Sequence, residues 1–175
     1  MLTRRQSLLA LLTVSVASSL SPVAFAASDG RPDKLVAGLY DRILKNPDLP
    51  GFGVKKADRK LLSKSLGELW DKTEGKRKRI KDEMGPLGFD MVTNSQTGDL
   101  KSYDLTITEI TARNATVKAR FNRGEDYAEA ERVDVVEYRL VDENGWKIDD
   151  IRGKTSGQAW TLRELLSNYL NDPKF

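Results

Sequence analysis

Apolar residues in the first part of the chain recur at the spacing of a helix. They stand three or four residues apart, at Leu35, Val36, Leu39, Tyr40, Ile43 and Leu44. This spacing places them on one face of an amphipathic helix. Pro32 suits the first turn of that helix, and Asn46-Pro47 ends the pattern. We therefore expect a helix that begins at Pro32 and ends at Asn46-Pro47.

A second helical pattern follows a loop at residues 48–53. Asp58 is a residue type that caps helix N-termini, so we expect the second helix to begin there. Its apolar face would consist of Leu61, Leu62, Ser65, Leu66, Leu69 and Trp70. Gly75 interrupts the pattern, and Ile80 and Met84 resume it. Both a third short helix and an extension of the second fit this spacing.

After Gly98 the apolar period changes from about 3.6 to about 2, which is typical of half-buried strands. Four such stretches lie at residues 102–108, 115–121, 133–141 and 146–151. Asn144-Gly145 favours a tight type I′ hairpin between the last two. Thr161 and Glu164 then form a capping box that opens a C-terminal helix. This order predicts an α+β domain, with N-terminal helices packed on a four-stranded antiparallel sheet.

Residues 1–26 have the three zones of a secretory signal peptide. Arg4-Arg5 supplies the positive start, a short apolar run spans residues 8–16, and Ala24-Phe25-Ala26 is a cleavage site. The run is shorter than the roughly 20 residues of a membrane-spanning helix. We expect cleavage after Ala26, a periplasmic location in a bacterial envelope, and one soluble domain over residues 27–175 without a transmembrane segment. The general-secretory and twin-arginine export routes both remain open.

The composition excludes several classes of catalytic chemistry and of binding partner. The chain has no His and no Cys, which excludes Ser-His-Asp and Cys-His triads, thiolate nucleophiles, and metal sites built on imidazole or thiolate. Catalysis would have to use Asp, Glu, Tyr, Lys or Arg, and we predict no catalytic residue, metal or cofactor. The net charge of +3 includes Arg4 and Arg5 of the leader and falls to +1 without them. We therefore expect no nucleic-acid partner.

Two adjacent acids are the first candidates for a site. Asp149 and Asp150 point to opposite faces of a strand, so they cannot share one ligand. Asp150 shares the face of Trp146 and would look into the interior, where burial raises the pKa of a carboxyl group. It is then either a general base or a structural carboxylate, bonded to a loop or to an arginine such as Arg120 or Arg139.

Other candidates also carry two interpretations. Asp90 could stand at a pocket mouth, or it could cap the turn that enters the sheet. The basic run at residues 76–79 with Lys81 is either a solvated helix face or a contact for lipid phosphate, anionic glycan or acidic protein. Five aromatic residues could line a pocket, and each also fits ordinary core spacing. The candidate ligand-binding residues are therefore Tyr40, Trp70, Asp90, Tyr103, Tyr138, Trp146 and Asp150.

Several segments carry a family resemblance. They are the leader, Leu39-Tyr40, residues 86–90, residues 136–140, and the Asn144-Gly145-Trp146-Lys147-Ile148-Asp149-Asp150-Ile151 run. On these segments the chain resembles the nuclear-transport-factor-2-like fold and, more specifically, the bacterial exported domain-of-unknown-function family 3828. The resemblance implies a curved sheet wrapped around helices to make a cone with a pocket. It implies no established activity and no catalytic residue, and Met91-Val92 and Ser95-Gln96-Thr97 depart from the family pattern.

Three hypotheses for the function follow. The first is a non-enzymatic ligand-binding or protein-interaction module of the envelope, with an unknown small molecule or envelope protein as partner. The second is an inhibitor or immunity-type protein that acts through the loop at residues 49–54. The third is a small pocket isomerase or dehydratase that uses Asp150 or Asp90 as base. We also expect a homodimer through the open sheet face, which carries Thr106, Thr108, Lys118 and Arg120.

Overall fold

The computed structural model describes residues 30–47, 52, 56–96, 100–125, 127–129 and 132–174, so the predicted leader and most of the loop at residues 49–54 lie outside the described residues. Five strands form one antiparallel sheet in the order β1-β2-β3-β4-β5. The strands are β1 (Ser102–Ile110), β2 (Asn114–Asn122), β3 (Val133–Asp142), β4 (Trp146–Thr155) and β5 (Gln158–Thr161). The helices are α1 (Pro32–Lys45), α2 (Lys56–Arg59), α3 (Lys64–Ile80) and α4 (Leu162–Asn171).

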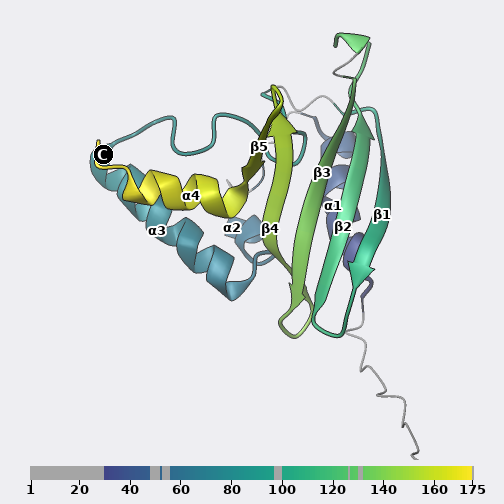
Figure 1. The fold of residues 1–175 in the computed structure, drawn as a ribbon, viewed down its shortest axis with the longest axis horizontal. Coiled ribbons are helices and arrows are strands. Elements are labelled where there is room, and N and C mark those ends of the chain that lie inside the picture. The colour runs from purple at the N-terminus through teal and green to yellow at the C-terminus, as the bar shows by residue number, and fades with distance from the viewer. Residues whose placement is uncertain are drawn as a thin grey trace, which may run out of the picture.

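The three longer helices form two groups around the sheet (Figure 1). The first is α1, which packs against β1 and β2. The second is the pair of α3 and α4, which lie side by side and reach the sheet at β4 and β5. Side chains from both groups meet the sheet in one hydrophobic core. Within the described ranges, no helix has the length and the apolar composition that crossing a membrane requires.

The central strands alternate between buried apolar and exposed polar residues, as the period of two predicted. The buried row consists of Ala115, Val117, Ala119, Phe121, Val136, Tyr138 and Leu140. Lys118 and Arg120 between them are exposed, because only one face of an antiparallel sheet needs to be covered. At the β3–β4 hairpin, Asn144 and Gly145 have positive φ angles of 58° and 118°, as expected for this sequence, but Asp142 pairs with Trp146, so the connection has three residues rather than the two of the predicted type I′ turn. The α+β class and the antiparallel sheet are therefore confirmed.

The sheet has a fifth strand that the prediction of four strands missed. β4 continues to Thr155, and Ser156 and Gly157 then turn the chain with positive φ angles of 51° and 79°. Residues 158–161 return as β5 and pair with residues 152–155. A strand of four residues is too short to show an alternating pattern, so the glycine turn was its main signal in the sequence.

The predicted start of the second helix at Asp58 is wrong. Ser63 caps α3 instead, and its hydroxyl accepts a backbone N–H of the first turn at 3.1 Å. The helix continues through Gly75 and ends where Lys81 adopts a positive φ of 56°. No third helix follows it in the described residues, and Met84, which the pattern placed on a buried stripe, is 81% exposed.

A bulge in β4 changes the predicted direction of Asp150. Ile148 lies opposite Leu140 and Asp150 lies opposite Arg139, so Asp149 is an extra residue in the strand. The extra residue shifts the alternation by one, and Ile151 rather than Asp150 is the fully buried residue that lies opposite Tyr138. Asp150 therefore does not continue the row of Ile148, on which its predicted place in the interior depended.

Candidate functional site

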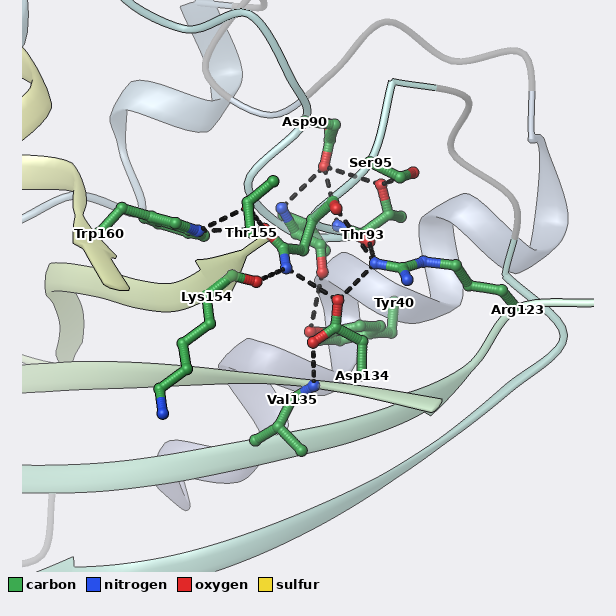
Figure 2. A network of polar contacts seen from close by, with 12 residues as sticks. Tyr40, Asp90, Thr93, Ser95, Arg123, Asp134, Val135, Lys154, Thr155 and Trp160 are labelled. Carbon is green, nitrogen blue, oxygen red and sulfur yellow. Dashed lines mark hydrogen bonds and ion pairs between the residues drawn. The ribbon is translucent and has the colours of Figure 1, made fainter. Parts of the chain in front are cut away.

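A polar network lies where the loop at residues 90–95 meets one end of the sheet (Figure 2). We call it the sheet-end network. Its members are Asp90, Thr93, Asn94, Arg123, Asp134, Lys154, Thr155 and Trp160. They come from the loop, the end of β2, the start of β3 and the β4–β5 hairpin. The network thus joins segments that are far apart in the sequence.

Asp90 closes the loop on itself. Its backbone exchanges two hydrogen bonds with that of Ser95, with N···O distances of 2.8 and 3.3 Å. One carboxylate oxygen accepts the N–H groups of Val92 and Thr93 at 2.7 and 3.0 Å, and the other accepts that of Phe52 at 2.9 Å. The interpretation as a turn cap describes this geometry, since backbone donors occupy both oxygens.

Asn94 links the loop to the rest of the sheet. It is buried with a positive φ of 50°, a conformation that Asn adopts more readily than most residues. Its amide nitrogen donates to the Asp134 carboxylate at 2.8 Å and to the backbone carbonyl of Lys154 at 2.6 Å. Its amide oxygen accepts the Thr155 hydroxyl at 2.8 Å and the Trp160 indole N–H at 3.1 Å. All four hydrogen-bonding positions of the amide are therefore occupied.

The buried Arg123 forms an ion pair with the half-buried Asp134 beside this amide. One guanidinium nitrogen of Arg123 lies 2.5 Å from the Asp134 carboxylate and donates to the carbonyls of Thr93 and Asn94 at 2.9 and 3.0 Å. Asp134 also accepts the N–H of Val135 at 2.7 Å. Withdrawing the guanidinium and part of the carboxylate from water is costly, and the additional hydrogen bonds help to offset that cost. Neither residue was among the predicted site residues.

The chemistry that this network can perform is limited. A general base needs a lone pair within hydrogen-bond reach of a substrate proton. The two carboxylates accept backbone N–H groups, the Asn94 amide or Arg123, and the hydrogen-bonding capacity of the amide is filled. In the described residues, the network holds backbone segments together and presents no reactive group.

Three of the predicted pocket residues form a tyrosine cluster in the core. Tyr40 and Tyr138 are fully buried, and the Tyr138 hydroxyl donates to that of Tyr40 at 3.1 Å. The Tyr40 hydroxyl donates to the Val92 carbonyl at 3.0 Å, which connects the cluster to the loop of Asp90. Tyr103 stacks on Tyr40 with ring centroids 4.9 Å apart. Burial raises the pKa of both Tyr40 and Tyr138 well above the ordinary value, so both hydroxyls stay protonated.

The remaining aromatic candidates lie apart from this cluster. Trp70 is buried on α3, with the Arg59 guanidinium 4.6 Å from its ring centroid. Trp146 is half-buried at the start of β4 and packs against the core. In the described part of the chain, no ring contact joins either tryptophan to Tyr40, and no hydrogen bond joins Asp150 to the tyrosines. The contacts of the described residues thus join Tyr40, Tyr103 and Tyr138 to one another and, through Val92, to the loop of Asp90.

The two adjacent acids have different partners. Asp150 is buried, and one of its oxygens accepts the backbone N–H groups of Ile151 and Arg163 at 3.0 and 3.1 Å, which caps the start of α4. Burial raises its pKa, although these bonds partly oppose the shift. The suggested partners Arg120 and Arg139 form no hydrogen bond or ion pair with it in the described residues.

Asp149 forms an ion pair with Arg163 and accepts the hydroxyls of Ser63 at 2.7 Å and Ser65 at 3.2 Å. Burial alone would raise the pKa of Asp149. The Ser63 hydroxyl, the Arg163 charge and the Ser65 hydroxyl outweigh it, so the pKa lies below its ordinary value. The bulged acid therefore remains ionised and joins β4 to the beginnings of α3 and α4.

Two hollows in the surface are lined by none of the predicted pocket residues. One of about 200 Å³ is lined by residues of β1, β2, β3 and β4, including Arg139 and Asp149, and the other, of about 630 Å³, lies between α3 and α4. Lys76 of the basic run lines the second hollow, but its ammonium group donates to the carbonyls of Tyr169, Leu170 and Asp172 at 2.8 to 3.0 Å. It thereby caps the C-terminus of α4. No acidic cluster suited to a metal ion occurs among the described residues.

Comparison of the chain with protein-family models, with curated proteins and with solved structures found no match. The resemblance to the nuclear-transport-factor-2-like fold and to family 3828 therefore stays a prediction. The geometry of the described residues is the basis on which a function can be proposed.

Proposed function

We propose that this chain is a non-enzymatic binding or interaction module of the bacterial envelope. The observation that carries the proposal is that the groups best suited to chemistry serve the structure. Asp90 and Asp150 accept backbone N–H groups, and Tyr40 and Tyr138 are buried against each other. The isomerase or dehydratase alternative needs one of these carboxylates as a base beside an open cavity, and neither lines the two hollows described above.

The cellular location and the fold family are part of the same proposal. The tripartite leader supports export, cleavage after Ala26 and a periplasmic location. The cone-like arrangement of family 3828 is supported by α1 packed against β1 and β2 and by the Trp146–Ile151 run in β4. An envelope protein or a small molecule is the partner that these features favour.

Native mass spectrometry of the protein purified from its own envelope tests this function. We expect a mature chain that begins at Ala27 and carries a bound partner or small molecule. Asp150→Asn should keep the affinity for that partner within a few-fold, because an amide oxygen can still accept the N–H of Arg163.

The matched comparison is Asp90→Asn, which keeps the same acceptor oxygen in the turn. A folded Asp150→Asn or Asp90→Asn protein that binds its partner but fails to turn it over would instead support the enzyme. A full-length chain retained in the cytoplasm would contradict the envelope location.

A further inference from the structure

Among the described residues, the outer edge of β1 has no strand beside it. β1 is nine residues long and lies at the end of the strand order, with β2 as its one neighbour in the described sheet. Figure 1 shows it as the outermost strand on that side. No backbone hydrogen bond from a described residue reaches the outer side of residues 102–110. An open edge of this kind presents unpaired N–H and C=O groups to any strand that can lie beside it.

The composition of β1 does little to protect this edge. Proteins usually block an edge with Pro, charged side chains such as Lys, inward-facing charges or bulges, and residues 102–107 contain one of these, the outward-facing charge of Asp104. A bulge interrupts the ladder between Ile107 and Glu109, which leaves the preceding residues as a regular strand. Tyr103, Leu105 and Ile107 stay half-buried, while Asp104 and Thr106 are exposed on the other face. A new strand would therefore meet one apolar face and one polar face.

The sequence of β1 is complementary to itself in one antiparallel register. If Leu105 lies opposite Leu105 of a second copy, Tyr103 lies opposite Ile107 and Asp104 lies opposite Thr106. Apolar side chains then meet on the buried face, and each carboxylate meets a hydroxyl on the exposed face. Centring the pair on Asp104 would place two carboxylates opposite each other, and centring it on Thr106 would bring Glu109 against Tyr103. A shift by one residue would turn the apolar row outward.

We infer that β1 pairs with β1 of a second copy of this chain, antiparallel and centred on Leu105, so that the two sheets join edge to edge. This surface differs from the open sheet face on which the sequence placed a homodimer. The inference stands on the geometry of the edge and does not rest on the proposed function.

Opposite charges at Thr106 test this register. In the paired edge, residue 106 lies opposite Asp104 of the other copy, and this contact occurs twice by symmetry. Thr106→Asp should weaken association, and Thr106→Lys should strengthen it, by about fivefold each. Within one copy residue 106 lies opposite Lys118, so Thr106→Asp should stabilise the monomer slightly and Thr106→Lys should destabilise it. Sedimentation equilibrium and urea unfolding should therefore rank the two variants in opposite orders.

Val135→Asp and Val135→Lys are the matched controls. Val135 is exposed on β3 in the middle of the sheet, where an edge contact does not reach it. We expect both controls to associate as the unmodified protein does. A shift in association caused by the Val135 variants would assign the interface to the sheet face and overturn the inference, and so would a protein that stays monomeric at the highest soluble concentration. Shifts of the same sign for both Thr106 variants would overturn the register.

The absence of cysteine allows a direct test of the pairing. In the inferred register residue 105 lies opposite itself, so Leu105→Cys should form an intermolecular disulfide on mild oxidation. Thr106→Cys is more exposed, and random collision would crosslink it faster than Leu105→Cys. We expect the reverse order on non-reducing gels. Faster crosslinking of Thr106→Cys would contradict the inference.

Discussion

The outer sides of β4 and β1 are built in opposite ways. On β4, the short strand β5 covers residues 152–155, and a parallel bridge between Leu62 and Ile148 covers the other part of the strand. The N–H of Ser63 and the carbonyl of Leu61 bond to the Ile148 backbone at 2.8 Å each. At the β1 edge, no described residue bonds to the outer side of the strand. We call these the closed edge and the open edge.

The difference shows where polar side chains carry structure. Residues around the closed edge and the sheet-end network include several buried polar groups with specific partners: Ser63, Asn94, Arg123 and Asp150. The polar residues of the open edge, such as Asp104 and Thr106, are exposed to water. A buried polar group that loses its partner costs roughly 1–3 kcal/mol, whereas an exposed one exchanges its partner for water. Substitutions should therefore cost much more stability on the closed side than on the open side.

The largest effect is expected at Arg123. Arg123→Met removes the buried partner of the ion pair and leaves the Asp134 carboxylate and the carbonyls of Thr93 and Asn94 without this donor. The free energy of unfolding should fall by about 3 kcal/mol. Urea unfolding followed by circular dichroism measures this loss.

The matched control for Arg123 is Arg120→Met on the same strand. Arg120 is exposed, and its removal should change stability by less than about 0.5 kcal/mol. Equal losses in the two variants would mean that the sheet-end network does not hold the closed side together.

Ser63→Ala is expected to have a smaller effect on the same side. The hydroxyl caps α3 and also donates to Asp149, so its loss should lower the free energy of unfolding by about 1 kcal/mol. Ser102→Ala at the start of β1 is the matched serine on the open edge, where the side chain is exposed. The melting temperature of Ser63→Ala should be clearly lower than that of Ser102→Ala, and the reverse order would contradict the comparison.

The parts of the fold that could be predicted are those set by near neighbours in the sequence. α1, the Asn144-Gly145 turn and the cap of α4 by Thr161 each depend on residues a few positions apart. The start of α3 was misplaced because Asp58 and Ser63 are both residue types that cap helices. What decides between them is the pairing of Leu62 with Ile148, which draws the segment before Ser63 alongside β4. No local pattern contains that contact.

The candidate site shows the same limit. The turn formed by Asp90 was a possible interpretation because its N–H donors lie two and three residues away. The partners of Asn94 lie 40 and 60 residues away, and no spacing rule could join them. The predicted direction of the Asp150 side chain was wrong for another reason. A single bulged residue reverses the alternation of the strand, and no sequence pattern marks it.

The smallest expected effect is a pair of opposite pH dependences at the closed edge. The folded-state pKa of Asp150 is raised, so its contribution to stability is fully present below the unfolded pKa of about 4 and is lost as the pH rises through the folded value. The folded-state pKa of Asp149 is lowered, so its contribution is present above about pH 4 and is lost as the pH falls through the folded value. Replacing either acid with Asn removes the pH dependence of stability that this acid causes.

The stability of each variant relative to the unmodified protein should therefore change with opposite sign as the pH rises. Asp150→Asn should gain relative stability, because the unmodified protein has to keep a buried carboxylate ionised at higher pH. Asp149→Asn should lose relative stability, because the carboxylate of the unmodified protein ionises as the pH rises and then pairs with Arg163, which the amide of the variant cannot do. Asp104→Asn, which removes an exposed carboxylate from the open edge, corrects both series for the change in net charge. Urea unfolding between about pH 3 and pH 7 measures the three series, and parallel slopes for the two β4 acids would show that the bulge does not give them different environments.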